Sequence, residues 1–155
     1  MRRMSLCFLI AFIVTLCWGV RSSLPLCSVS SLPLNFGAYD PLSDSPADTE
    51  GSIAVDCDEA PPPLVTISLG PSPSSGSFDP RTMNRFGGSD RLSYNLYTDA
   101  PRRQIWGNGT GATVRLSRKV NKNSTWNAEV YGRILPGQDV SAGSYADTLS
   151  VIIDW

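Results

Sequence analysis

Apolar and polar residues alternate with a period of two in many short segments of the chain, and no stretch beyond residue 26 keeps a helical period for long. Alternation of this kind is typical of strands that bury one face. Clusters of Gly, Pro, Ser and Asp separate the segments, as turns do. The pattern therefore predicts an all-β fold of antiparallel strands. The predicted strands are residues 27–36, 51–57, 64–69, 91–98, 113–119, 126–135 and 147–155.

The last predicted strand has the clearest pattern. One face carries four apolar residues, Leu149, Val151, Ile153 and Trp155. The other face carries Thr148, Ser150 and Asp154, and Ile152 is its one apolar exception. Such a strand buries one face. No further segment follows Trp155 in the sequence to cover the strand's edge, so this edge is covered either by another strand of the chain or by a partner.

The first residues have the order of a secretory signal. A basic head (Arg2 and Arg3) precedes an apolar run at 6–18 and then small residues. The run is shorter than the roughly 20 apolar residues of a membrane helix. We expect a signal peptide at 1–22 with cleavage after Ser22, or alternatively after Gly19. The mature domain is then 23–155, with no stable membrane span.

Charge and residue usage exclude several classes of function. Removal of 1–22 takes away three of the 13 basic residues, so ten remain against 14 acidic ones. A net negative domain disfavours nucleic-acid binding. The chain has no histidine, which removes the usual general base and most zinc sites. We therefore predict no catalytic residue, no cofactor and no metal.

The acidic cluster Asp56, Asp58 and Glu59 is better explained as a solvated strand end than as a calcium site, because it lacks EF-hand spacing.

Cysteine usage predicts one disulfide. Two of the four cysteines lie in the signal, which leaves Cys27 and Cys57. Two cysteines in an exported domain favour a bond between them. The bond would close a loop of 31 residues, for which the loop-entropy model gives about 3 to 4 kcal/mol.

Five aromatic residues lie in strand-like stretches, and for them core packing is favoured over a carbohydrate-stacking platform. They are Tyr94, Tyr97, Trp106, Trp126 and Tyr131.

Eight short motifs follow one another in a specific order. They are Cys27-Ser28-Val29, Phe36-Gly37-Ala38-Tyr39-Asp40, Val55-Asp56-Cys57, Arg81-Thr82-Met83, Leu92-Ser93-Tyr94-Asn95-Leu96-Tyr97-Thr98-Asp99, Ile105-Trp106-Gly107, Val130-Tyr131-Gly132-Arg133-Ile134 and Gly143-Ser144-Tyr145-Ala146-Asp147-Thr148. In this order they resemble the spore coat protein U domain family, which includes subunits of archaic chaperone/usher pili. The resemblance runs from Cys27 to Trp155.

The resemblance implies an immunoglobulin-like antiparallel β-sandwich that lacks its final strand. A hydrophobic groove would lie next to the C-terminal strand, to be filled first by a periplasmic pilus chaperone and then by the N-terminal extension of a neighbouring pilus subunit. The residues that match the family's groove edge are Leu149, Val151, Ile153 and Trp155. Cys27 and Cys57 match its disulfide. The resemblance also implies an outer-membrane usher as a partner, and a role as a structural subunit of a surface fibre in adhesion and biofilm formation.

The segment ahead of Cys27 is short for a donor strand. Cleavage after Ser22 would leave four residues, which reach about 13 Å, against about 17 to 20 Å for an ordinary strand. This predicts a tip or accessory subunit.

A free secreted β-sandwich that binds carbohydrate or another surface is the alternative from a different class. A secreted hydrolase is a third, although no catalytic constellation supports it.

Overall fold

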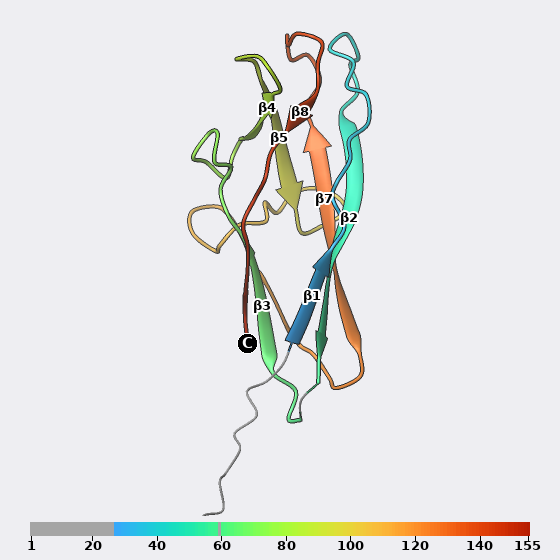
Figure 1. Cartoon of the computed structure of the whole chain (residues 1–155), viewed down its shortest axis with the longest axis vertical. Coiled ribbons are helices and arrows are strands. Elements are labelled where there is room, and N and C mark those ends of the chain that lie inside the picture. The colour runs from blue at the N-terminus through green and yellow to red at the C-terminus, as the bar shows by residue number, and fades with distance from the viewer. Residues whose placement is uncertain (1–26, 59) are drawn as a thin grey trace, which may run out of the picture.

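A computed structural model describes residues 27–58 and 60–155, and every regular element in these residues is a β-strand (Figure 1). The predicted signal peptide and residues 23–26 lie outside the described residues. All named strand pairs are antiparallel. The predicted all-β, antiparallel fold is therefore confirmed.

The strands form two sheets. The larger sheet has the order β1-β2-β7-β5-β4-β8. Its strands are β1 (Cys27–Ser31), β2 (Ala47–Cys57), β7 (Thr125–Ile134), β5 (Arg91–Tyr97), β4 (Arg81–Arg85) and β8 (Tyr145–Ala146). The smaller sheet has the order β6-β3-β9, with β6 (Leu116–Lys119), β3 (Leu64–Leu69) and β9 (Val151–Asp154). The molecule is elongated, with β1, β3 and the end of the chain toward one end and β4, β5 and β8 toward the other (Figure 1).

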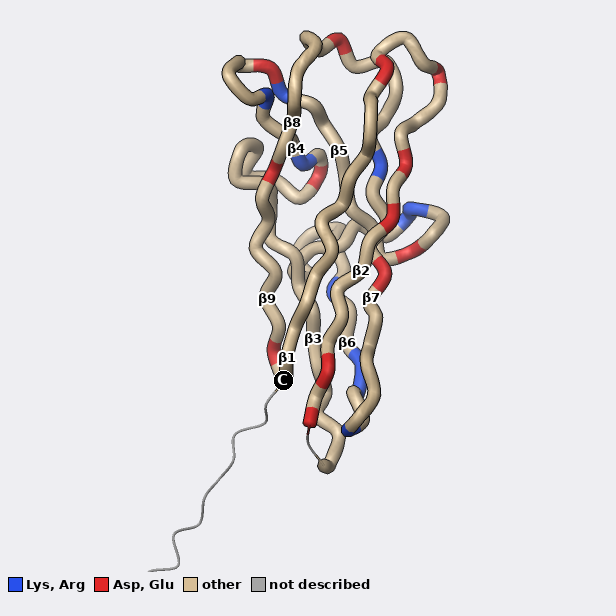
Figure 2. The backbone as a smooth tube through the Cα atoms, turned by 45° about the vertical axis from the view of Figure 1, so that its right-hand side comes forward, with Lys and Arg blue, Asp and Glu red and all other residues tan. Residues whose placement is uncertain are grey.

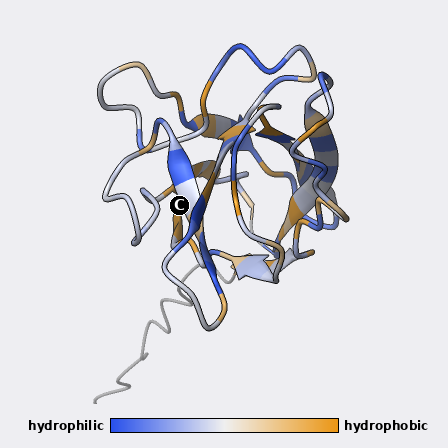
Figure 3. Cartoon of the chain, turned by 90° about the horizontal axis from the view of Figure 1, so that it is seen from above, coloured by the Kyte–Doolittle hydropathy of each residue, from blue (hydrophilic) through white to orange (hydrophobic). Residues whose placement is uncertain are grey.

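The period of two in the sequence becomes the inward face of each long strand. In β7, every second residue from Trp126 to Ile134 is buried and most of the others are exposed. Ile53, Val55 and Cys57 do the same in β2. These side chains join those of β3 in one hydrophobic cluster between the sheets. Seen from above, polar and apolar colours accordingly alternate along the strands (Figure 3).

Trp106 joins the two sheets at one side of this core. It lies outside the named strands, in a bridge to Val114, and is 0% exposed. Its indole Nε1 donates to the Ile67 carbonyl of β3 (3.2 Å), and its backbone N–H donates to the Leu96 carbonyl of β5 (2.9 Å). Because β3 and β5 belong to different sheets, Trp106 ties the two sheets together.

Arg81 of β4 is also fully buried. Its guanidinium donates to the carbonyls of Trp106 (2.6 Å) and Gly70 (3.1 Å) and to Oδ1 of Asn95 (2.8 Å). Asn95 in turn donates to Asp79 (3.0 Å). Burial lowers the pKa of Arg81 from its ordinary value. The strand was not predicted from the sequence because its buried positions include a cation and a threonine, which break the apolar alternation.

Several predicted strand limits were wrong. The first strand ends at Ser31, five residues early, since Pro33 follows and has no N–H for the ladder. The second begins at Ala47, because polar residues ahead of Gly51 pair with β7. The strands predicted at 113–119 and 147–155 shorten to β6 and β9. The two residues of β8 were too few to give a pattern.

Candidate functional site

A groove runs along one side of the sandwich and consists of two adjoining pockets. The strand-side pocket, of about 480 Å³, lies between residues 31–36 on one lip and residues 145–151 on the other. The loop-side pocket, of about 560 Å³, continues between residues 34–41 and 140–145. The two pockets share Leu34, Phe36, Met83 and Tyr145. The groove therefore separates the segment that contains β1 from the segment that contains β9.

The floor of the strand-side pocket is apolar and comes from both sheets. Its side chains include Ile53, Leu69, Leu96 and Val130, which are all buried. Each lip adjoins an outermost strand, since residues 32–36 follow β1 and residues 147–150 precede β9. Within the part of the chain that the structure describes, β1 pairs only with β2 and β9 only with β3. β1 and β9 lie toward the same end of the molecule, where Figure 2 labels both strands and Figure 1 marks the end of the chain.

The hydrogen-bond ladder shows which backbone groups of β9 face the groove. The N–H of Gly70 donates to the Ser150 carbonyl (2.9 Å), and Leu69 is paired with Val151. Hydrogen-bonded and non-hydrogen-bonded pairs alternate in an antiparallel ladder. The backbone N–H and C=O groups of Val151 and Ile153 therefore point away from β3, toward the groove edge.

The same alternation applies to β1. The N–H of Leu32 donates to the Ser52 carbonyl (3.3 Å), and Ser31 is paired with Ile53. Val29 and Ser31 therefore direct their backbone groups away from β2. Both lips offer alternate donors and acceptors to whatever lies between them.

Three of the four predicted groove-edge residues face the interior. Leu149 and Val151 line the strand-side pocket, and Leu149 and Ile153 pack partly buried against the core. Val151 is nevertheless 41% exposed. Trp155 lies one residue beyond β9 and is 50% exposed. Ile152, the exception in the pattern, points to the other face and is 52% exposed.

The predicted disulfide is confirmed. Cys27 and Cys57 are bonded, with their Cα atoms 4.2 Å apart. They face each other in the β1–β2 register at a non-hydrogen-bonded pair, where side chains approach most closely. The bond fixes the first residue of β1, and with it the start of one lip of the groove.

One polar pair interrupts the apolar groove. The Tyr94 hydroxyl donates to Oδ2 of Asp147 (2.8 Å), and the Thr148 N–H donates to Oδ1 (2.9 Å). Burial, and after it the bond to Asp147, raises the pKa of Tyr94. On its other side, the Tyr94 ring packs edge-on against Phe36 of the opposite lip, with ring centroids 5.9 Å apart. This pair was not predicted, although Tyr94 and Asp147 each lie in one of the eight motifs.

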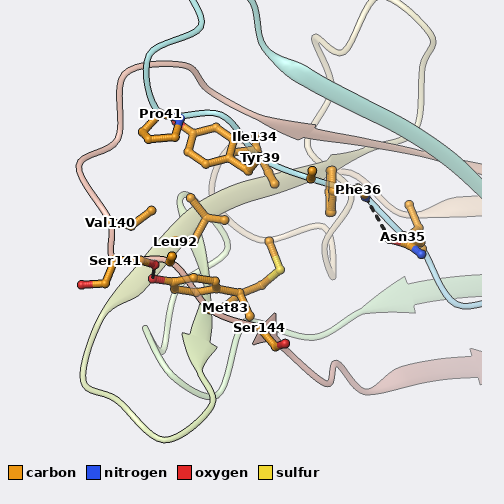
Figure 4. A pocket seen from close by; sticks show the side chains of 16 residues that line it. Asn35, Phe36, Tyr39, Pro41, Met83, Leu92, Ile134, Val140, Ser141 and Ser144 are labelled. Carbon is orange, nitrogen blue, oxygen red and sulfur yellow. Dashed lines mark hydrogen bonds between the residues drawn. The ribbon is translucent and has the colours of Figure 1, made fainter.

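Tyr39 lines the loop-side pocket (Figure 4) and is held in place by Gln138. The Tyr39 hydroxyl donates to the Leu135 carbonyl (3.1 Å) and accepts from the Gln138 N–H (2.9 Å). The Gln138 amide bonds both the N–H and the carbonyl of Ser93, each at 2.8 Å. The side chain thus takes the place of a strand neighbour for β5. Sequence reasoning assigned neither residue.

The other candidate sites receive less support. Asp58 pairs with Lys122 (3.1 Å), and Asp56 accepts a hydrogen bond from Thr125, as expected of a solvated strand end. Glu59 lies outside the described residues. Residues 27–58 and 60–155 contain no group of three or more His, Cys, Asp or Glu side chains suited to a metal. In the same residues no helix has the length and hydropathy to cross a membrane.

The aromatic side chains divide between core and surface. Tyr94, Trp106 and Trp126 belong to the core, as predicted. Tyr97 and Tyr131 are only partly buried and face each other across β5 and β7.

Comparison with known proteins gives three findings. The model of the Spore Coat Protein U domain family matches residues 16–152. Protein U of Myxococcus xanthus is 33% identical over an alignment of 128 residues that covers 77% of this chain and 70% of that protein. Among solved structures, a chain of the CsuC–CsuE chaperone–tip adhesion subunit pre-assembly complex, from archaic chaperone-usher Csu pili of Acinetobacter baumannii, superposes with a TM-score of 0.60 at 22% identity.

That superposition covers 85% of this chain but only 40% of the other, so it establishes likeness of fold alone. The E. coli Hda pilus minor tip subunit, HdaB, is more distant, with a TM-score of 0.45 and 10% identity over 81% of this chain and 79% of that one.

Proposed function

Because the chain belongs to the Spore Coat Protein U domain family, we propose that it is a structural subunit of a chaperone/usher surface fibre. In this proposal the sandwich is incomplete, and a strand from a partner fills the groove between β1 and β9. The periplasmic pilus chaperone supplies that strand first, and a neighbouring subunit supplies it in the fibre. The outer-membrane usher, export through the periplasm after loss of a signal peptide at 1–22, and a role of the fibre in adhesion and biofilm formation belong to the same proposal.

The observation that carries the proposal is an apolar floor between two strand edges, those of β1 and β9, that have no strand neighbour among the described residues. Unpaired backbone groups at a sheet edge favour the addition of another strand. Val151 and Leu149 project from the β9 lip over the floor. Burial of a large apolar side chain contributes roughly 1.5 to 3 kcal/mol. One added strand would therefore satisfy the backbone of both lips and cover the floor together.

The groove-edge role of Leu149, Val151, Ile153 and Trp155 is tested by co-expression with the cognate periplasmic chaperone. Val151→Asp places a charge on the groove side of β9 and should abolish co-purification of the chaperone, followed by degradation of the subunit. Ile152→Asp is the matched control, since Ile152 is the next residue of the same strand and faces outward. Ser150→Asp, also on the outward face, should be similarly mild.

Two results would contradict the proposal. Equal loss of chaperone with Val151→Asp and Ile152→Asp would show that the groove side of β9 is not the contact. A wild-type subunit that accumulates as a stable monomer without the chaperone would favour the alternative, a free secreted binding domain.

We further propose a tip or accessory position in the fibre. A subunit that lends no strand has no neighbour on its far side, and cleavage after Ser22 would leave only four residues ahead of Cys27. N-terminal sequencing of the mature protein tests the position. A mature chain that begins well before residue 23, or purified protein that polymerises by itself, would make it a shaft subunit.

A further inference from the structure

We infer that Asp147, held by Tyr94, forms a polar subsite inside the groove and selects partner strands that carry a hydrogen-bond-donating side chain, above all a lysine or arginine, at one inward-facing position. The inference rests on the proposed function, since it names the chemistry of the strand that the groove would accept.

Asp147 is placed to meet such a strand. It lines the strand-side pocket and is partly buried there, on the same lip as Leu149 and Val151. Tyr94, its partner, rises from β5 in the floor and touches Phe36 of the opposite lip. Phe36 also lines both pockets. A strand that fills the groove from one pocket into the other must therefore pass over the Tyr94–Asp147 pair.

The Asp147 carboxylate keeps capacity for a further donor. Two carboxylate oxygens offer about four acceptor sites. One oxygen receives the Tyr94 hydroxyl and the other the Thr148 N–H. None of the ion pairs among the described residues includes Asp147.

The charges around the pair leave Asp147 without a contacting cation. Tyr94 is neutral, since burial raises its pKa. Arg81, opposite Tyr94 in the β4–β5 register, acts on Asp147 only at a distance, because its guanidinium is bound to the carbonyls of Gly70 and Trp106 and to Asn95. Asp79 lies on the far side of Asn95. The Asp147 carboxylate therefore receives hydrogen bonds from Tyr94 and Thr148, and its partial exposure leaves the rest of it accessible to water.

A covering strand would remove that water. A carboxylate taken out of water without a compensating donor or cation is strongly destabilised. An ammonium, guanidinium or hydroxyl on the incoming strand would restore the lost interaction, whereas an apolar side chain at the same position would not. The floor elsewhere, with Ile53, Leu69 and Val130, has the opposite preference.

The test uses a designed peptide that alternates leucine with threonine, and a series in which each inward-facing leucine in turn is replaced by lysine. The affinity of the mature protein is measured for the parent peptide and for each lysine-containing peptide. At most positions we expect lysine to lower the affinity about tenfold or more, because it replaces a buried apolar side chain. At one position we expect lysine to be neutral or favourable. Asp147→Asn keeps an acceptor for Tyr94 and should remove that exception.

Asp154→Asn is the matched control, because Asp154 is an exposed acid of β9, and the exception should persist in it. If lysine weakens binding equally at every position, or if the tolerated position is unchanged in Asp147→Asn, the polar subsite is wrong while strand acceptance stands. If no peptide of the series binds, including the all-leucine parent, strand acceptance itself is contradicted and the inference falls with it.

Discussion

The two long sides of the sandwich differ in how their apolar residues are covered. On the side of β6 and β3, Val65, Ile67 and Trp106 are fully buried. On the side of β1 and β9, Val29, Leu32 and Val151 are exposed, although Val29 and Val151 belong to strands whose pattern predicts a buried face. The first side is closed by the chain itself, because Trp106 and its bridge to Val114 span the sheets. The second side has no equivalent among the described residues.

The difference shows that an apolar alternation predicts a buried face but does not say which molecule covers it. Among residues 27–58 and 60–155, β3 has a neighbour on both edges and β9 has one only on the side of β3. We therefore expect the closed side, at β6 and β3, to stabilise the isolated subunit. We expect the open side, at β1 and β9, to stabilise a complex with a partner strand.

Truncation of Trp106 should have the largest effect on the isolated subunit. Trp106→Ala removes a fully buried indole and its hydrogen bond to Ile67, for which we expect a loss of about 3 to 5 kcal/mol in the free energy of unfolding. Phe86→Ala is the control: Phe86 is 90% exposed, and a surface change of this kind stays within about 0.5 kcal/mol. Chemical denaturation measures both. Similar values for the two would mean that Trp106 does not hold the sheets together.

Loss of the disulfide should come next. Cys27→Ser with Cys57→Ser opens a loop with a sequence separation of 30, and we expect a loss of about 3 to 4 kcal/mol through the greater freedom of the unfolded chain. The wild-type protein with and without reductant gives the same comparison without a substitution. Unchanged stability after reduction would contradict a structural role of the bond at the start of β1.

The same substitution on the two sides sharpens the comparison further. Val55→Ala, at a fully buried position of β2, should cost about 2 kcal/mol from lost burial and the cavity left behind. Val151→Ala should cost the isolated subunit much less, because the side chain is 41% exposed. The order should reverse when affinity for a groove-filling strand is measured. Equal effects on stability would show that the open side is already closed in the free subunit.

The smallest effect concerns the ion pair between Asp48 and Arg133 on the outer face of β2 and β7. Two bonds of 2.7 Å join the side chains, and the hydrogen bond from Arg133 lowers the pKa of Asp48 below its ordinary value of 3.8. Because both groups are partly solvated and screened, we expect only about 0.2 to 1 kcal/mol.

A carboxyl whose pKa is lowered in the folded state adds stability above its unfolded pKa, and this stability is lost as the pH falls through the folded pKa. The difference between wild type and Arg133→Gln should therefore be full near neutral pH and shrink below pH 3.8. Denaturation at several pH values measures it, and a difference that grows in acid would contradict the assigned pair.

The elements that the sequence predicted and those it missed differ in what they bury. β2, β3, β5 and β7 were predicted because buried apolar residues stand at every second position within each strand. Examples are Ile53 in β2, Ile67 in β3 and Val130 in β7. β4 was missed because buried Arg81 donates its hydrogen bonds to carbonyls that are distant in the sequence, at Gly70 and Trp106, and such contacts leave no local pattern. In the candidate site, the inward face of Leu149, Val151 and Ile153 could be predicted from alternation. The Tyr94–Asp147 pair joins residues 53 positions apart, and nothing local in the sequence announces such a contact.

Amide hydrogen exchange at β9 tests most directly whether the open side accepts a strand. The ladder directs the N–H groups of Val151 and Ile153 toward the groove and those of Ile152 and Asp154 toward β3. In the free mature protein, Val151 and Ile153 should exchange fast and Ile152 slowly. With a groove-filling strand bound, Val151 and Ile153 should become protected while Ile152 changes little. Protection of Val151 and Ile153 already in the free protein, or none after the strand binds, would contradict strand addition at this edge.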